Sequence, residues 1–265
     1  MKLKAVSVLI AATGLICGAR GEFKPLLNTH SHNDYEQKRP LAEALDQGFC
    51  SVEADIYLID GQLLVAHNRE DVRPERTLQK MYLDPLRARI RERGGIYPGD
   101  PFFILLIDVK SEAGPTYLAL EKVLENYRDV LSQFTDSDWR TNKINVVISG
   151  NRAVSILAGE KERLAAVDGL LKDLPRNPPV TLIPEVSEPW GRHFRWRGGS
   201  PMPDEERTKL REMVAQVHAQ HRKLRFWDTP DRADLWQELL DAQVDLIGAD
   251  HLKDLHDFLV TQPPK

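Results

Sequence analysis

Residues 32–67 read HNDYEQKRPLAEALDQGFCSVEADIYLIDGQLLVAH, and the fold prediction starts from this stretch. The segment Leu41–Gln47 has the pattern of a helix, and the apolar run Ser51–Leu58 after it has the pattern of a buried strand. Asp60 and Gly61 form an Asp-Gly pair, which is typical of a tight turn, so residues 63–67 are predicted to return beside that strand as a hairpin. A helix followed by an apolar strand is a repeating unit of α/β proteins.

Strand-like and helix-like runs alternate along the rest of the chain. The strand-like runs are Leu26–His32, Ser51–Leu58, Phe102–Lys110, Asn145–Ser149, Ala165–Gly169, Val180–Val186, Lys223–Trp227 and Asp245–Asp250. The helix-like runs between most of them are Leu41–Gln47, Leu78–Arg93, Thr116–Ser132, Ala153–Leu164, Asp204–His221, Arg232–Ala242 and His251–Val260. Eight strands in about 240 residues is the count of a (β/α)8 TIM barrel. We therefore predict an α/β protein with one TIM-barrel domain, with an open doubly wound sheet as the alternative.

The N-terminal residues have the three-part pattern of a secretory signal peptide. Met1–Lys4 contains two lysines, Ala5–Cys17 is an apolar run, and the small residues Gly18 and Ala19 follow. Because the run is short for a membrane span, we expect residues 1–19 to be removed and the mature protein to be secreted or periplasmic. The barrel domain would then be residues 20–265. An uncleaved N-terminal anchor is the alternative.

Charge and cysteine content restrict the classes of function. The chain has 265 residues and a net charge of −4, which argues against a nucleic-acid-binding protein with a basic surface. Of its two cysteines, Cys50 alone lies outside the predicted signal, so we expect no intrachain disulfide in the mature chain.

Two carboxylates in the second strand-like run predict a metal site. Glu53 and Asp55 alternate with apolar residues, so they share one strand face about 7 Å apart along the chain. Asp108, near the end of the third run, supplies a third carboxylate. Hard oxygen ligands of this kind suit Mg²⁺ or Ca²⁺. His32 and His67 lie on either side of the pair in the sequence and are candidates for a general acid and a general base.

Three further residues are candidates for substrate binding. Lys110 shares a face with Asp108 and could contact a phosphate oxygen or pair with a carboxylate. Arg225 could hold a phosphate with two hydrogen bonds, and Trp227 on the same face could form an apolar wall or pack in the core.

Polar residues are predicted to meet at one end of the barrel. They are placed at or near the carboxyl ends of the strand-like runs, where active sites of such barrels lie: His32, Asp55, Asp108, Lys110, Ser149, Glu185, Trp227 and Asp250. The segment Ser187–Pro203 is predicted to be a long loop over this mouth. Its aromatic residues Trp190, Phe194 and Trp196 could contact a lipid or sugar or pack the loop.

Two other interpretations remain open. His30 and His32 share a face, which is compatible with a metal-dependent amidohydrolase-type barrel, although later strand ends offer no further histidine ligands. A barrel that binds a phosphorylated ligand without turnover is the second alternative.

The order of these motifs resembles the PLC-like phosphodiesterase superfamily, which includes glycerophosphodiester phosphodiesterases and phosphatidylinositol-specific phospholipases C. The resemblance rests on His32, Glu53-x-Asp55, His67 after an Asp-Gly turn, and Asp108-x-Lys110. It implies a phosphoric diester hydrolase with a TIM barrel. It also implies one divalent cation on Glu53, Asp55 and Asp108, and His32 and His67 as the acid/base pair.

The resemblance is incomplete around the first histidine. Asn33 stands where glycerophosphodiesterases usually have arginine, and their Pro-Glu-Asn-Thr segment is absent. The implied substrate is therefore a small-molecule or lipid phosphodiester of unspecified head group. Hydrolysis or release of a cyclic phosphate, contact with a membrane surface, and the oligomeric state all stay open.

Overall fold

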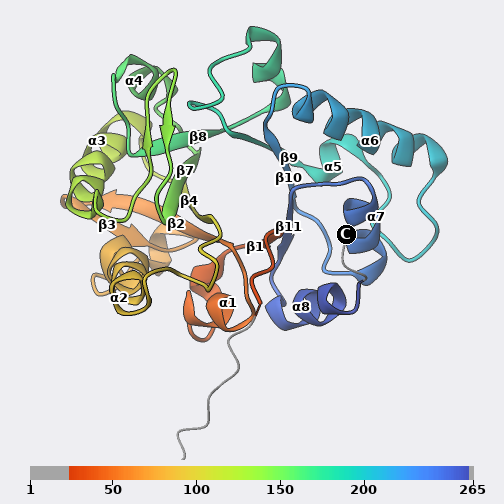
Figure 1. Cartoon of the computed structure of the whole chain (residues 1–265), viewed down its shortest axis with the longest axis horizontal. Helices are drawn as coiled ribbons and strands as arrows, with labels where there is room; N and C mark the ends of the chain where they lie inside the picture. Colours follow the sequence, from red (N-terminus) through yellow and green to blue (C-terminus); the bar gives the residue numbers. More distant parts are fainter. Residues whose placement is uncertain (1–23, 263–265) are drawn as a thin grey trace, which may run out of the picture.

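Eight parallel strands form a closed ring in the computed structural model, which describes residues 24–262 (Figure 1). The strands of the ring are β1 (Thr29–Ser31), β2 (Ser51–Ile59), β4 (Phe103–Val109), β7 (Ile144–Gly150), β8 (Ala165–Gly169), β9 (Glu185–Pro189), β10 (Lys223–Trp227) and β11 (Leu246–Ala249). Their order is β1-β11-β10-β9-β8-β7-β4-β2, and the pairing of Ser31 with Val52 joins β2 back to β1. The predicted TIM barrel is confirmed.

Helices surround the ring of strands (Figure 1). They are α1 (Ala42–Asp46), α2 (Asp84–Arg93), α3 (Ala113–Leu124), α4 (Val154–Gly159), α5 (Trp190–His193), α6 (Asp204–His218), α7 (Ala233–Asp241) and α8 (Leu252–Val260). Shorter turns are η1 (Asp34–Glu36), η2 (Arg69–Asp71), η3 (Gln79–Leu83), η4 (Glu125–Tyr127) and η5 (Leu171–Arg176), and a small hairpin pairs β5 (Gln133–Phe134) with β6 (Trp139–Arg140). Helices α7 and α8 each bury apolar side chains on one face, as helices that cover a sheet do.

The predicted hairpin after the second strand is confirmed. Strand β3 (Gln62–Val65) runs antiparallel to β2. Asp60 and Gly61 between them have φ values of 48° and 77°, and two successive positive φ angles are what a two-residue hairpin turn requires. The hairpin brings His67 back beside Asp55 in the middle of β2, because Ala66 N donates to Asp55 O.

The sixth strand begins later than predicted. Residues 180–182 form a turn, Leu182 N and Ile183 N both donate to Pro179 O, and β9 starts only at Glu185. Prolines at 179 and 184 lack the N–H groups of a strand, so the apolar run between them cannot pair along its length. Glu185 therefore lies at the amino end of its strand, and its predicted place at the carboxyl end is wrong.

The segment after β9 is packed rather than open. Trp190, Phe194 and Trp196 are buried, and the Trp190 indole N–H donates to Trp196 O at 2.7 Å. These aromatic residues therefore pack the loop and the helices beside it. Of their two predicted roles, the structure supports packing, and in this conformation they are not exposed for contact with a ligand.

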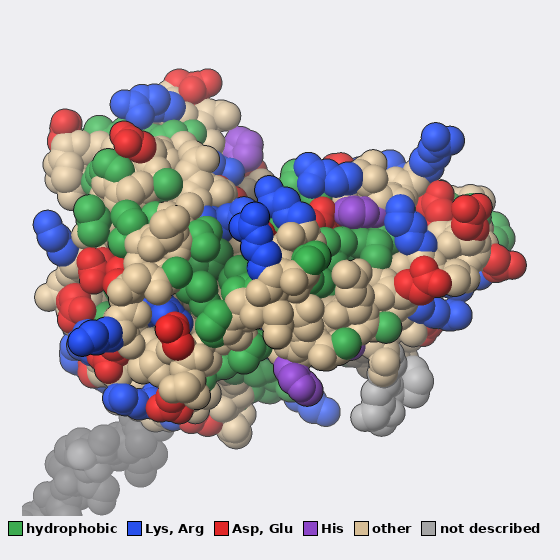
Figure 2. All heavy atoms as spheres, turned by 90° about the horizontal axis from the view of Figure 1, so that it is seen from above, with side chains coloured by type: hydrophobic (Ala, Val, Ile, Leu, Met, Phe, Trp, Pro, Cys, Tyr) green, Lys and Arg blue, Asp and Glu red, His purple; other side chains and the backbone are tan. Residues whose placement is uncertain are grey.

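The surface mixes both signs of charge. In Figure 2, acidic and basic side chains are interspersed over the face shown, with hydrophobic side chains between them. No helix among residues 24–262 combines the length and apolar character needed to cross a membrane. The predicted signal, residues 1–19, lies outside the described residues.

Candidate active site

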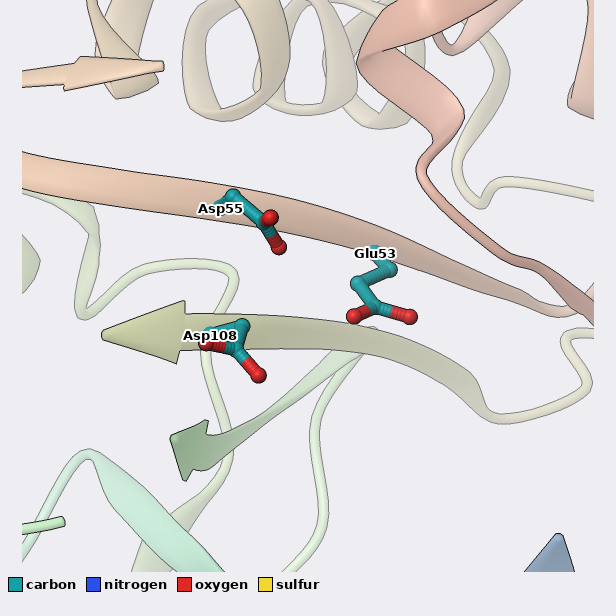
Figure 3. Close-up of side chains that lie close together, drawn as sticks. All are labelled: Glu53, Asp55 and Asp108. Carbon is teal, nitrogen blue, oxygen red and sulfur yellow. The ribbon is translucent and has the colours of Figure 1, made fainter. Parts of the chain in front are cut away.

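Three carboxylates gather at the carboxyl end of the barrel. Glu53 and Asp55 of β2 and Asp108 of β4 extend to the same side of these neighbouring strands (Figure 3). Asp55 and Asp108 are register partners, and Glu53 stands two residues before Asp55. One oxygen from each carboxylate lies within 4.8 Å of the other two. This set of hard ligands is suited to a single divalent cation.

The contacts of Asp55 fit such a cation. Asp55 Oδ2 accepts a hydrogen bond from the Tyr35 hydroxyl at 2.7 Å and lies 3.0 Å from Lys110 Nζ, whereas Oδ1 is buried without a partner in the described chain. A buried carboxylate oxygen without a donor is costly, and a metal ion would satisfy it.

The charge of the cluster also fits a divalent ion. Lys110 Nζ lies 3.2 Å from Asp108 Oδ1 as well as beside Asp55. The three carboxylates outnumber the two cations beside them, Lys110 and the Arg225 guanidinium 3.4 Å from Glu53, so the cluster is net negative. A divalent cation would neutralise that charge, while Lys110 remains at the edge of the site with its side chain partly exposed.

The two carboxylates of β2 differ in their acidity. Burial raises the pKa of Asp55 to about 6, and the charge of Glu53 adds to that rise. Burial acts in the same direction on Glu53, but the hydrogen bond with His30 and the charge of Arg225 outweigh it, so the pKa of Glu53 lies well below its usual range. Glu53 is therefore ionised throughout the physiological pH range.

His30 is a fully buried neighbour of Glu53. Its Nε2 lies 3.0 Å from Glu53 Oε2 and 2.9 Å from Arg225 Nη1, and its Nδ1 lies 2.8 Å from Ser51 Oγ. Burial, reinforced by Arg225, lowers the pKa of His30 to about 4. The group suited to a metal among residues 24–262 consists of the three carboxylates, so the geometry favours that group over a site on His30 and His32.

His32 lies at the carboxyl end of β1 and is held by a carboxylate from the far end of the chain. Its Nδ1 atom lies 2.7 Å from Asp250 Oδ1. Burial lowers the pKa of His32, but the hydrogen bond with Asp250 and the negative charges of Glu53 and Asp250 together outweigh burial, and the pKa is raised above its usual value. Because Nδ1 contacts Asp250, Nε2 is the ring nitrogen left to exchange a proton with a substrate.

His67 shares its contacts with the carboxylate cluster. Its Nδ1 atom lies 3.1 Å from the Tyr35 hydroxyl and 3.2 Å from Asp55 Oδ2. The Tyr35 hydroxyl donates its single proton to an acceptor oxygen. Toward His67 it can therefore act only as a hydrogen-bond acceptor, so Nδ1 of His67 carries the proton in that arrangement. Its Nε2 atom is then the basic nitrogen.

Arg225 of β10 is buried inside the barrel and also lines the pocket beside His32. The guanidinium lies 3.4 Å from Glu53 and 3.7 Å from Asp168, and its Nε donates to Ser187 Oγ at 3.0 Å. It therefore balances two buried carboxylates and fixes the position of Glu53. A direct contact between Arg225 and substrate stays a prediction.

A small pocket adjoins His32. Its volume is about 140 Å³, and its walls include Trp227, Asp228, Asp231 and Asp250. Trp227 is 44% exposed, which distinguishes it from the buried aromatic residues of the core. The position of Trp227 in this pocket is compatible with an apolar wall of the substrate site, and that role stays a prediction.

Two positioning contacts were not predicted from the sequence. Tyr35 bridges Asp55 and His67, and its only sequence signal was an aromatic residue in a polar turn directly after His32. Asp250 was noted as a strand-end residue, but its contact with His32 joins positions 218 residues apart. Local pattern does not reveal a pairing over that separation.

Solved structures with a similar fold are phosphodiester-cleaving enzymes by title. A phosphodiesterase from Oleispira antarctica in complex with the product sn-glycerol-3-phosphate has a TM-score of 0.55 and 13% identity, covering 88% of this chain and 97% of that one. A glycerophosphodiester phosphodiesterase from Parabacteroides distasonis has a TM-score of 0.54 and 15% identity, covering 90% and 99%. Phosphatidylinositol-specific phospholipase C from Listeria monocytogenes has 0.51 and 9%, covering 91% and 96%. At these identities the likeness shows the fold, a (β/α)8 barrel.

Curated relatives are more similar in sequence. Altered inheritance of mitochondria protein 6 homolog from Arthroderma benhamiae is 27% identical over 259 residues, which cover 83% of this chain and 80% of the relative. Altered inheritance of mitochondria protein 6 from Eremothecium gossypii is 27% identical over 299 residues, covering 92% and 76%.

These relatives overturn the predicted location. Their names refer to the inheritance of mitochondria, which contradicts a secreted or periplasmic protein. The prediction rested on a short apolar run behind two lysines, and such a run does not by itself specify a destination.

The family match spans the candidate site. The AIM6-like phosphodiesterase domain matches residues 22–167, more than half of the chain. This range contains both histidines, the three carboxylates and Lys110, and it ends before Arg225. The chain therefore belongs to the family of AIM6-like phosphodiesterase domains.

Proposed function

We propose that this protein is a metal-dependent phosphodiesterase in which His32 and His67 form the acid/base pair. The observation that supports it most is that two oriented histidines lie near a negatively charged carboxylate cluster with an unsatisfied oxygen on Asp55. Acid/base groups beside an anionic metal site are the parts that cleavage of a phosphodiester needs.

The cation would be one Mg²⁺ or Ca²⁺ ion held by Glu53, Asp55 and Asp108. When bound, it supplies positive charge for the phosphoryl oxygens. Glu53 suits this role because Arg225 and His30 keep it ionised, and Lys110 supplies a further positive charge at the edge of the cluster. In this proposal Lys110 would contact a phosphate oxygen of the substrate.

The two histidines divide the proton transfers. Each is held through Nδ1, His32 by Asp250 and His67 by Tyr35 and Asp55, so each presents Nε2 to a substrate between them. One takes a proton from the attacking hydroxyl group, and the other gives a proton to the leaving alkoxide. Since both side chains are partly exposed, they can exchange protons with solvent between turnovers.

The proposed substrate is a small-molecule or lipid phosphodiester. The pocket beside His32, with the exposed ring of Trp227 and several carboxylates, offers a place for part of the alcohol or head group. The attacking hydroxyl could come from water or from the substrate itself, which would give a phosphomonoester or a cyclic phosphate.

Phosphorus NMR tests this function directly. The purified protein is incubated with glycerophosphodiesters, lysophospholipids and phosphoinositides, each with Mg²⁺, with Ca²⁺ and with a chelator. We expect new phosphomonoester or cyclic-phosphate signals that vanish with the chelator, and the signal identifies the product type. The double variant His32→Ala/His67→Ala is the matched control for a contaminating enzyme. Turnover that survives in the chelator or in this variant would contradict the proposal.

A further inference from the structure

A second pocket lies at the amino-terminal mouth of the barrel, at the opposite ends of the strands from the carboxylate cluster. Its volume is about 270 Å³. It is lined by residues at the start of strands, including Ile104 of β4, Glu185 of β9 and Lys223 of β10, and by Phe134 and Trp139 of the β5–β6 hairpin. Pockets near this size and of largely apolar lining are the usual sites for small organic molecules.

Two residues that line this pocket each carry a buried polar atom without a partner in the described chain. Glu185 is 2% exposed, and its Oε1 atom has no hydrogen-bond partner in the described chain. The indole Nε1 of Trp139 is likewise buried without an acceptor. Each unsatisfied group costs free energy, and together they require one hydrogen-bond donor or acceptor for the carboxyl group and one acceptor for the indole.

The charges of the pocket disfavour a charged occupant. Lys223 is the register partner of Glu185, and its Nζ lies 3.4 Å from the centre of the Phe102 ring. Burial, together with the charge of Asp168, raises the pKa of Glu185 to about 8, and burial lowers the pKa of Lys223. Because burial already disfavours the charged forms of both groups, a further charge of either sign would also lose its hydration here.

We propose that this pocket binds a small uncharged molecule with a mostly apolar body and one hydroxyl or amide group. A hydroxyl or amide can donate to Glu185 or accept from Trp139, while the body contacts Phe102, Ile104 and Phe134. Water alone fits less well, because apolar walls leave most of its hydrogen bonds unmade, and displacing such water favours binding. The site is separate from the proposed phosphodiester chemistry and stands or fails independently of it.

Titration with four benzene derivatives tests the proposal on the whole protein. The probes are benzyl alcohol, toluene, benzoate and benzylammonium, and the readout is the indole N–H resonance of Trp139 in a ¹⁵N spectrum. Because the chain has five tryptophans, Trp139→Phe identifies the resonance by its loss. We expect benzyl alcohol to shift this resonance saturably, and both charged probes to bind at least about tenfold more weakly.

Glu185→Leu separates the polar contact from the apolar one. We expect it to weaken benzyl alcohol about tenfold, the loss of one hydrogen bond, and to leave toluene binding unchanged or tighter. If Glu185→Leu does not fold, ligand-observed NMR on Trp139→Phe tests the other contact in the same way. A pocket that holds water only would show no saturable shift with benzyl alcohol, and that result, or equal binding of charged and neutral probes, would overturn the proposal.

Discussion

The two ends of the barrel each bury a glutamate, and the two differ in what surrounds them. Glu53, toward the carboxyl end, contacts His30 and Arg225, and its pKa is held well below the usual range. Glu185, at the amino end, has one carboxyl oxygen without a partner, and burial raises its pKa to about 8. Burial alone therefore does not set the charge of a carboxyl group in this fold, because the partners decide it.

This difference separates the functions proposed for the two ends. An ionised, anchored carboxylate can hold a cation, whereas an unpartnered carboxyl group in an apolar wall suits a neutral ligand.

The largest effect is expected at the carboxyl end, from the histidines. His32→Ala and His67→Ala should each lower kcat by about 10²- to 10⁴-fold, because each removes a proton-transfer group. His218→Ala is the matched control, since His218 is also partly exposed but pairs with Asp245 beside the amino end of β11. Steady-state kinetics on a substrate found by phosphorus NMR measure the effect. Near-normal turnover in either site variant would remove that histidine from the mechanism.

The two glutamates should respond differently to the same substitution. Glu53→Gln removes the charge that balances Arg225 and should lower the free energy of unfolding by about 3 kcal/mol. Glu185→Gln removes no such pairing contact and should change it by less than about 1 kcal/mol. Urea unfolding in the presence of a chelator measures both without a contribution from bound metal. Equal losses would show that partners do not distinguish the two sites.

The sequence predicted the barrel because each strand and helix carries its own local pattern. Glu53, Asp55 and Asp108 were predicted together because parallel strands place their carboxyl ends at one mouth. Glu185 was misplaced because two prolines broke an apolar run that looked like one strand. The local pattern specified the elements, but it could not specify where pairing begins within a proline-interrupted run.

The partners of the site residues were beyond local pattern. Asp250 reaches His32, and Arg225 reaches Glu53, only after the last strands close the ring beside the first. Such contacts depend on register between segments about 200 residues apart in the sequence, for which a single chain gives no periodic signal. The identity of the chemical groups could be predicted, and their mutual orientation could not.

Metal affinity should sharpen the view of Glu53 as a cation ligand. Glu53→Gln should weaken Mg²⁺ or Ca²⁺ binding by about tenfold or more, since it removes one charged ligand. Lys110→Ala should change affinity less, because Lys110 contacts Asp55 and Asp108 without being a ligand. Isothermal titration calorimetry with each metal compares the two variants. A loss in Lys110→Ala as large as that in Glu53→Gln would mean that Lys110 orders the ligand set.

Asp34 provides an intermediate case between the two glutamates. It is buried and accepts hydrogen bonds from Ser31 Oγ, Leu41 N and the Tyr82 hydroxyl, but none of these described partners is cationic. Burial raises its pKa to about 6, whereas an unfolded aspartate titrates near 3.9. Donors without a cation thus leave it less acidic than Glu53, with a smaller effect on stability.

The pH dependence of stability tests this intermediate position. Between pH 4 and 6 the folded protein holds a proton on Asp34 that the unfolded chain releases, so this contribution to stability is present below about pH 4 and is lost as pH rises through 6. Asp34→Asn has no such proton. The free energy of unfolding of the native protein minus that of Asp34→Asn should therefore fall by about 2 kcal/mol from pH 4 to pH 7. Urea unfolding at several pH values measures this difference. A difference that is constant with pH would show that the three hydrogen-bond donors cancel the effect of burial on the pKa of Asp34. Cationic partners would then not be needed to explain the low pKa of Glu53.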